Sequence, residues 1–203
     1  MQILKNNIRL QIEQAASMLF SSVGYEKSGI AEIAKKAGIS TGNVYRYFDN
    51  KQKLLYSIVS DDFVKSCFKI LLEKIGNVKS LSSDQIAASK EFARGNLYLL
   101  DFLICNRLKL VILMKGCPGT RFEDFNSRIR SAVIKAVSGY FSSVTSKRKK
   151  KVVFSKNLLL ETLYENLINA TLVILASKTS DVECQQTLQM LIEYHLKGMS
   201  TFA

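Results

Sequence analysis

The sequence predicts an all-α protein, with a small three-helix unit at residues 1–50 and a larger helical part at residues 51–203. One observation is the scarcity of turn-forming residues, because the 203 residues include a single proline and ten glycines. A second is the spacing of apolar residues, which recur every three or four positions along most of the chain. A third is the apolar content of 47%, which is sufficient for a sizeable core.

The first helix is expected at residues 8–23, where small and apolar side chains form one stripe at helical spacing. Gly24 directly follows the last residue of this stripe and is expected to end the helix. The stripe consists of Ile12, Ala15, Ala16, Leu19, Phe20 and Val23.

Two short helices joined by a tight turn are expected at residues 28–51. Gly38 stands where a helix end favours a left-handed residue, and Ser40 is a natural N-cap for the second helix. Ser28 is a candidate cap for the first of the two. This order is typical of a helix-turn-helix, in which the second helix lies in the DNA major groove.

Helices are expected to continue to the end of the chain. Residues 97–114 are almost wholly apolar, which predicts a buried helix, and residues 116–119 form a turn. A possible cap at Asp84 opens a helix that Gly95 and Asn96 interrupt. The other expected helices span residues 51–75, 84–94, 121–144, 155–178 and 181–201.

Composition limits the cellular location. No apolar run is expected to reach the roughly 18 residues that cross a membrane, since Asp101, Arg107 and Lys109 interrupt the longest one. The N-terminus lacks the layout of a signal peptide, so we expect a cytoplasmic protein with no membrane partner.

Chemistry-bearing residues are sparse. The four cysteines are widely separated and the chain has one histidine, so we expect buried free thiols, no metal site and no cofactor. A redox sensor is the alternative for the thiols. His195 is expected at the surface or an interface. The chain has neither a catalytic Ser-His-Asp pattern nor a phosphate-binding loop, and we expect no enzyme activity.

The formal net charge of +12 favours an anionic partner. The basic excess is spread along the chain, because residues 1–51 contribute 7 basic and 4 acidic side chains, a net +3, and the remainder contributes +9. Charge alone therefore does not locate the contact surface.

The N-terminal region resembles the tetracycline-repressor (TetR) family of bacterial transcriptional regulators. Apolar, small, Gly, Tyr, Phe and Lys positions fall in register over nearly fifty residues, in the segments IRLQIEQAASMLF, GY, IAEIAKKAGIS, GNVYRYF and NKQKLL. Two positions depart from the family pattern. Ser28-Gly29 stands where a Thr-Thr or Thr-Ser pair is common, and Tyr47 stands where His is common.

The resemblance and the helical angle count together name the candidate DNA-binding residues. With Val44 and Phe48 facing the core, the side chains at 42, 43, 45 and 46 point outward. Asn and Arg suit adenine and guanine, Thr suits a thymine methyl, and a glycine permits close approach. The resemblance implies base proximity for Thr41, Gly42 and Asn43 and phosphate contacts for Tyr45, Tyr47 and Lys51. The angle count adds Arg46 as a further base reader, and a cap position at the start of the first short helix makes Ser28 a further candidate for a phosphate contact.

The resemblance also implies that residues 51–203 form a ligand-binding and dimerisation domain. Two candidate sets for contact with a small-molecule effector are Tyr98, Asp101, Phe102 and Cys105 on one helix face, and Thr162, Asn166 and Asn169 on another. Asp101 either reads a polar ligand group or pairs with a neighbouring Arg or Lys. The polar stripe at 162–169 faces either a pocket or water. Leucine-rich faces near the C-terminus suit a homodimer bundle or the core of one subunit, and comprise Leu159, Leu163, Leu167, Leu175, Leu188, Leu191, Ile192 and Leu196.

The sequence thus predicts a ligand-responsive repressor that binds a pseudo-palindromic double-stranded DNA operator as a dimer. The alternatives are a ligand-independent dimeric DNA-binding protein, an activator, or an enzyme that carries an N-terminal DNA-binding module. The lack of a catalytic pattern in residues 52–203 disfavours the enzyme.

Overall fold

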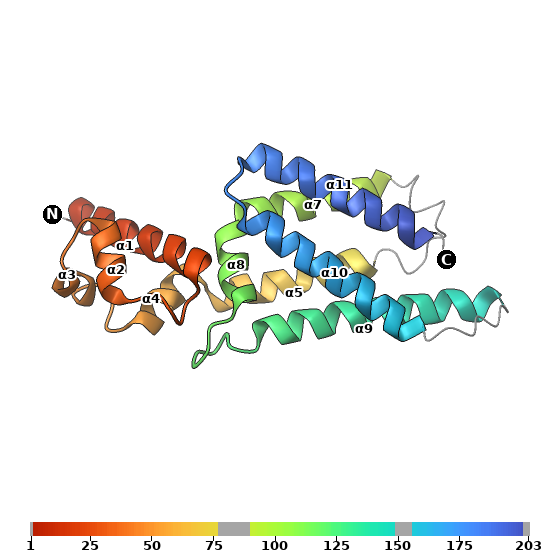
Figure 1. The fold of residues 1–203 in the computed structure, drawn as a ribbon, viewed down its shortest axis with the longest axis horizontal. Coiled ribbons are helices and arrows are strands. Elements are labelled where there is room, and N and C mark those ends of the chain that lie inside the picture. The colour runs from red at the N-terminus through yellow and green to blue at the C-terminus, as the bar shows by residue number, and fades with distance from the viewer. Residues whose placement is uncertain (1, 77–89, 149–155, 201–203) are drawn as a thin grey trace. The chain divides into compact units, whose positions relative to one another are not determined.

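The computed structural model describes residues 2–76, 90–148 and 156–200, and within these ranges every regular element is a helix (Figure 1). The prediction of an all-α fold is confirmed. The helices group into two compact units. The first unit comprises residues 1–65 and 107–126, and the second comprises residues 66–106 and 127–203. The division at residue 50 between a DNA-binding and a ligand-binding domain stays a prediction about function.

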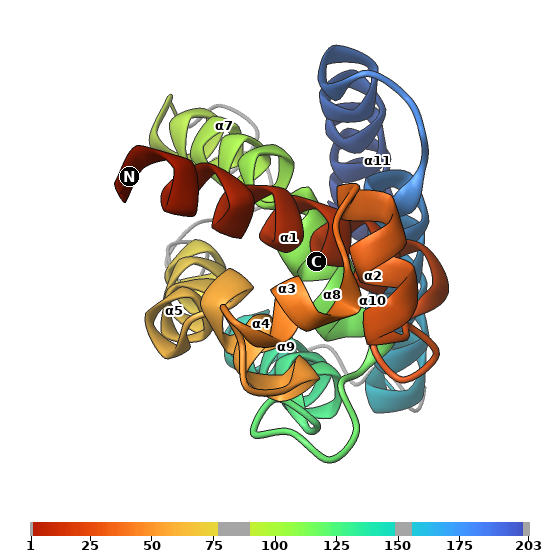
Figure 2. The same cartoon turned by 90° about the vertical axis from the view of Figure 1, so that its left-hand side faces the viewer.

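The first unit combines the N-terminal helices with a helix from the middle of the chain. Helix α1 packs against α2, α4 and α8, and α3 lies next to α2 (Figure 2). The core is apolar and includes Ile12, Phe20, Ile33, Leu54, Leu55, Val111, Ile112 and Leu113, all fully buried. The helices are α1 (Gln2–Val23), α2 (Ile30–Ala37), α3 (Thr41–Tyr45), α4 (Lys51–Ile58), the beginning of α5 (Asp61–Gly76) and α8 (Arg107–Lys115).

Helix α1 follows the predicted stripe, with Ile12, Ala15, Ala16 and Phe20 buried. It begins earlier than expected, at Gln2, and ends at Val23. Gly24 has a φ of 95°, a left-handed conformation that a residue with a side chain rarely adopts, and this residue terminates the helix as predicted.

The prediction of one long helix at residues 51–75 is wrong, because the structure has two helices there and the first ends at Ile58. Val59 has extended backbone angles (φ −118°, ψ 111°) and is fully buried. Ser60 then caps α5, since its Oγ accepts a hydrogen bond of 3.1 Å from the Phe63 N–H. Asp61 and Asp62 add favourable negative charge to the first turn of α5.

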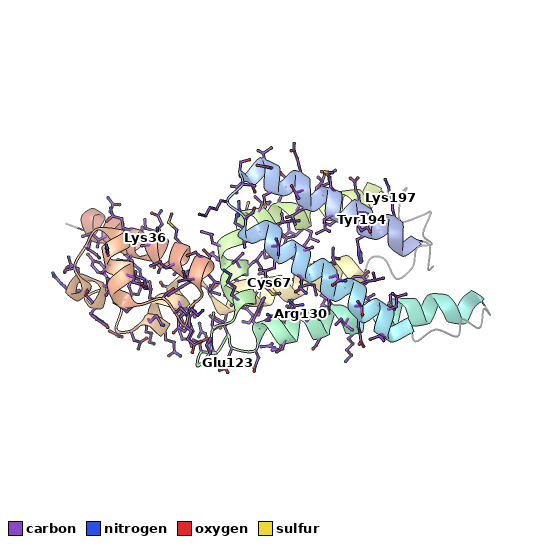
Figure 3. All side chains as sticks on the ribbon, in the orientation of Figure 1. Lys36, Cys67, Glu123, Arg130, Tyr194 and Lys197 are labelled. Atoms are coloured by element: carbon purple, nitrogen blue, oxygen red, sulfur yellow. The ribbon has the colours of Figure 1, made fainter. Side chains whose placement is uncertain are left out.

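The second unit is a bundle in which α11 packs against both α10 and α7 (Figure 1). Arg130 on α9, labelled in Figure 3, bonds to Glu165 and to Asn169 on α10 and so ties these two helices together. Buried apolar residues line the interior, namely Cys67, Ile70, Leu100, Ile129, Val133, Val137, Leu160, Leu175, Cys184 and Leu188. The helices are the remainder of α5, then α7 (Lys90–Cys105), α9 (Phe125–Arg148), α10 (Lys156–Ala176) and α11 (Asp181–Ser200).

The prediction of a single buried helix at residues 97–114 is also wrong. Asn106 separates α7 from α8, and its backbone N–H and its Nδ2 both donate to the Phe102 carbonyl. A side chain that competes for a backbone acceptor in this way favours a helix end. Gly95 and Asn96 do not interrupt α7, and the expected cap at Asp84 lies outside the described residues.

The helix expected at residues 121–144 begins instead at Phe125. The preceding turn continues as far as Asp124, and Gly116 and Gly119 have φ values of 93° and 71°. The two C-terminal helices match their expected ranges closely.

Helix α10 corrects the expectation that no segment has the length and composition of a membrane span. The window Leu158–Ala176 has a mean hydropathy of 1.4 over 19 residues, and only 11% of it is buried. Its surface also carries Glu161, Asn166 and Asn169. Length and composition alone do not separate a membrane span from a helix that packs in a protein bundle.

The expectation of four buried thiols is wrong for Cys105, which is exposed, and correct for the other three. Cys117 is fully buried, and burial raises the pKa of its thiol to about 12. It therefore stays protonated at neutral pH and is unreactive.

Candidate nucleic-acid interface

Local signals in the sequence build the turn between α2 and α3. Gly38 adopts the left-handed conformation, with φ 70°, and the N–H groups of Gly38 and Ile39 donate to carbonyls of the last turn of α2. The Ser40 Oγ then accepts a 3.3 Å hydrogen bond from the Asn43 N–H. Both predicted caps are confirmed, and they fix the point where α3 begins.

Helix α3 is anchored by the two residues expected to face the core. Val44 is fully buried and Phe48 is 4% exposed. The guanidinium of Arg9 on α1 lies 5.2 Å from the centroid of the Phe48 ring, while its Nε contacts Glu13 at 3.1 Å. Sequence reasoning missed this contact, because Arg9 and Phe48 are distant in the chain.

The opposite face of α3 is open to solvent. Thr41, Gly42, Tyr45 and Arg46 are exposed, and Tyr45 has 52% of its surface accessible. Asn43 and Tyr47 are half-buried at the edges of this face. The outward face predicted from the angle count is therefore present, and it carries the residue types that read bases and phosphates.

Gly42 is not required by the fold. Its φ is not among the positive values, and a Cβ added to it would have no heavy atom within 4 Å. Alanine in this helix would be more stable than glycine by roughly 0.5–1 kcal/mol. A glycine on an exposed helix face, with no internal reason for it, is consistent with close approach by another molecule.

Ser28 has an internal role that differs from its expected one. The N-cap of α2 is Gly29, whose N–H donates to Glu32 Oε2 at 3.1 Å, so the expected cap at Ser28 is wrong. Ser28 is 1% exposed, and its Oγ donates to the Gly24 carbonyl at 2.7 Å. The buried hydroxyl therefore stabilises the turn after α1.

The Lys51 side chain also turns inward in this structure, and its expected contact with a phosphate stays a prediction. Its Nζ donates to the carbonyls of Tyr25, Glu26 and Ser28 at 2.9, 3.1 and 3.2 Å. The same atom lies 4.5 Å from the centroid of the Tyr25 ring. An ammonium group has three N–H donors, so these three carbonyls account for all of them in this conformation.

Residues 107–126 form hydrogen bonds with the end of α1, a contact that the sequence alone did not predict. The Lys115 Nζ donates to the carbonyls of Ser21 and Ser22 at 2.7 and 2.8 Å. A cation at this position satisfies free carbonyls and suits the negative end of the α1 dipole. The contact joins residues more than ninety positions apart, which no local pattern can indicate.

The turn after α8 attaches to α4 in a similar way. The Gln52 Nε2 donates to the Gly119 carbonyl at 2.9 Å, and the Arg121 N–H donates to the Tyr56 Oη at 3.1 Å. The Arg121 guanidinium stacks on the Tyr56 ring at 4.0 Å and pairs with Asp61 at 3.0 Å. The segment 107–126 thus holds both α1 and α4.

A cluster of weakly acidic groups lies beside these contacts. Burial raises the pKa of Tyr25, and proximity to Cys117 and Tyr56 raises it further. Tyr25 and Phe20 meet edge to face, with their ring centroids 5.3 Å apart. The raised pKa keeps Tyr25 protonated at physiological pH, and its ring packs in the core of the first unit.

The first candidate set for effector contact lies on the outer face of α7. Tyr98, Asp101 and Cys105 are exposed, and Phe102 is half-buried. The Asp101 Oδ1 accepts a 3.1 Å hydrogen bond from the Gln185 Nε2 of α11, so the partner in this structure is an amide, neither of the two alternatives named for it. The four residues share a face as predicted, but within this chain that face is a surface.

The second candidate set is exposed as well. Thr162, Asn166 and Asn169 face outward on α10. The Thr162 hydroxyl donates to the Leu158 carbonyl at 2.8 Å, and Asn169 accepts from Arg130 at 2.7 Å. Whether either set contacts an effector stays a prediction.

His195 on α11 is half-buried, and its ring meets that of Tyr164 on α10 edge to face at 4.7 Å. Burial lowers the pKa of the imidazole, so the neutral form is favoured in the folded protein. Among the described residues, its Nε2 is a buried polar atom without a hydrogen-bond partner.

Comparison with known proteins agrees with this geometry. Residues 12–58 match the family model of bacterial regulatory proteins of the tetR family, and this range covers α2, α3 and α4. A TetR-like transcriptional regulator from Rhodococcus sp. RHA1 has the same fold, with a TM-score of 0.52 at 19% identity over 95% of this chain and 96% of that one.

Two curated relatives extend the comparison. An HTH-type transcriptional regulator of Staphylococcus aureus (strain USA300) is 31% identical over 115 residues, which cover 56% of this chain and 57% of that protein. The fatty acid metabolism regulator protein of Bacillus subtilis (strain 168) is 31% identical over 87 residues, which cover 41% and 43%. The chain spans about half the length of these relatives. Residues 12–58, which include the helix-turn-helix segment, are thus similar to the tetR family of bacterial regulatory proteins.

Proposed function

We propose that the protein is a DNA-binding transcriptional regulator that places α3 in the major groove. The observation that carries this proposal is the outer face of α3, which is exposed and free of internal roles while Val44 and Phe48 hold the opposite face in the core. Gly42 stands in the middle of this face with open space around it. A recognition helix needs such a face, since base edges are reached only at short range.

The side chains on this face divide into two roles. Thr41, Asn43 and Arg46 are the candidate base readers, because a thymine methyl, an adenine edge and a guanine edge suit them in turn. Tyr45 and Tyr47 are the candidate phosphate contacts. The net charge of +12 supports the proposal, because it attracts the protein to a polyanion.

We propose a homodimer that binds two half-sites of a pseudo-palindromic operator. The support is the apolar surface left open on the last two helices, where Val173, Val182, Met190 and Tyr194 are each at least 66% exposed (Figure 3 labels Tyr194). Where exposed apolar side chains form one contiguous patch, the patch marks an interaction site. A two-fold dimer then presents two copies of α3 to DNA, about one helical turn or a multiple of it apart.

We further propose that the regulator is a repressor that responds to a small molecule. Its support is the similarity of residues 12–58 to the tetR family and the presence of a second, helical unit that does not include α3. The matched relatives do not identify the effector, since each match covers little more than half of the relative or less. A thermal-shift screen tests this point. An effector at one hundred times its Kd should stabilise the protein by about 2.7 kcal/mol, whereas a DNA-binding protein without an effector gives no hit.

The test of DNA binding is selection of duplexes from a random pool. The parent protein should enrich an inverted repeat. Arg46→Glu should abolish enrichment, because it places negative charge on the α3 face. Lys178→Glu is the matched control, since it makes the same charge change at an exposed residue between α10 and α11. Failure of the parent protein to enrich any duplex would overturn the proposal.

A further inference from the structure

The contacts of Lys51 point to a function different from a phosphate contact. Three backbone carbonyls of one turn converge on its ammonium group, all within 3.2 Å. The Tyr25 ring covers the same group at 4.5 Å. Charge-assisted hydrogen bonds of this kind are about twice as strong as neutral ones. The side chain is thus bound within the protein before DNA is present.

The turn that Lys51 binds lies between α1 and α2. Gly24 opens it in the left-handed conformation, and the Ser28 N–H closes it on the Tyr25 carbonyl at 3.3 Å. Gly29, the N-cap of α2, follows directly. Lys51 is the first residue of α4, so its side chain joins the start of α4 to the start of α2.

Helix α3 lies in the chain between the two helices that Lys51 joins. It has five residues, too few to be stable as an isolated helix, and it follows α2 and precedes α4 in the chain. Its own anchors are the Ser40 cap and the buried side chains of Val44 and Phe48. Holding the starts of α2 and α4 together therefore limits the directions in which α3 can point.

We infer that Lys51 is a positioning residue for DNA recognition, which sets the orientation of α3 by clamping the turn at residues 25–28. The inference rests on the proposed DNA-binding function. It predicts that the geometry of the three donors matters as well as the charge. An ammonium directs three N–H groups from one atom, whereas a guanidinium spreads its donors over a planar fork.

Two substitutions separate the clamp from a phosphate contact. Lys51→Met removes both the charge and the donors. Lys51→Arg keeps the charge and suits a phosphate well, but it does not reproduce three donors on one atom. Lys53→Met is the matched control, because Lys53 is exposed on the same helix and its loss changes the net charge equally.

The experiment measures the Kd for the selected duplex over a series of salt concentrations at 10 °C, after thermal unfolding has shown that each variant is folded there. The clamp predicts that Lys51→Met and Lys51→Arg both bind about tenfold or more weakly than the parent protein. Their plots of log affinity against log salt should keep the parent slope, because no phosphate contact is lost.

Two results would overturn the inference. A slope reduced by about one in Lys51→Met, together with full binding by Lys51→Arg, would assign Lys51 to a phosphate. Parent-like binding by both folded variants would reduce its role to stability alone. Should Lys51→Met not fold, Lys51→Arg decides between the same outcomes.

A measurement without DNA separates this inference from the proposed function. The ammonium hydrogens of Lys51 should exchange with water more slowly than those of Lys53 in nitrogen-15 NMR spectra of the parent protein. Slow exchange in a protein that enriches no duplex would leave the clamp intact and overturn only the DNA-binding role. Equal exchange rates would overturn the clamp.

Discussion

Gly42→Ala should change protein stability and DNA affinity in opposite directions. The glycine lies in α3 without a positive φ, and an added Cβ meets no heavy atom within 4 Å. The free protein therefore gains the helix propensity of alanine at no steric cost, roughly 0.5–1 kcal/mol. In a chain of 203 residues this gain raises the Tm by about 1–4 °C.

The free energy lost in the DNA complex should exceed the free energy of unfolding gained by the free protein. If the α3 backbone approaches the base edges at Gly42, an added methyl group overpacks that contact, at a cost of about 1–3 kcal/mol. This cost weakens binding to the selected duplex roughly five- to 150-fold. Differential scanning fluorimetry and fluorescence anisotropy measure the two quantities on the same sample.

A matched control exists in α9. Gly139 is also helical, also lacks a positive φ and also has no heavy atom within 4 Å of an added Cβ. Gly139→Ala should raise the Tm by a similar amount and leave the affinity for DNA unchanged. Equal behaviour of the two variants, with stability raised and DNA binding intact, would refute close approach of DNA at Gly42.

Three further predictions concern the α3 face, the dimer and His195. Tyr45→Phe should weaken binding by a similar factor on selected and random duplexes, as a phosphate contact does, whereas Arg46→Ala should change the consensus recovered from a random pool. The parent protein should sediment as a dimer at micromolar concentration. Val173→Glu should dissociate the dimer, because a two-fold interface would bury two like charges. Val173 is 71% exposed in the single chain, so the fold of each subunit should tolerate the change. Burial lowers the folded-state pKa of His195, so the unfolded state binds a proton first as the pH falls below about 6.5. Acidification therefore favours the unfolded state, and the Tm should fall further between pH 7 and pH 5 in the parent protein than in His195→Phe.

Local sequence signals predicted the parts of the fold that depend on neighbouring residues. Gly38 and Ser40 gave the turn before α3, and the spacing of Val44 and Phe48 gave its buried face. The break between α4 and α5 was missed, although Ser60 followed by two aspartates is a recognisable N-cap signal. The helical spacing of apolar residues on both sides of Ser60 instead favoured the prediction of one long helix.

Contacts between distant residues were beyond prediction from one sequence. Lys51 binds carbonyls 23 to 26 positions away, and Lys115 binds carbonyls 93 and 94 positions away. Periodicity correctly grouped Tyr98 with Asp101, but it could not show that this side of α7 lies open to solvent. A helical pattern defines which residues share a face, whereas tertiary packing decides which face is covered.

The most direct test of the central claim is hydroxyl-radical labelling of the protein with and without its selected duplex. Tyr45 on α3 and Tyr98 on α7 are 52% and 62% exposed, so their rates of modification in the free protein should be similar. Binding of DNA to the α3 face should slow the labelling of Tyr45 several-fold and leave that of Tyr98 unchanged. Unchanged labelling of Tyr45 in a complex saturated with DNA would contradict the assignment of α3 as the recognition helix.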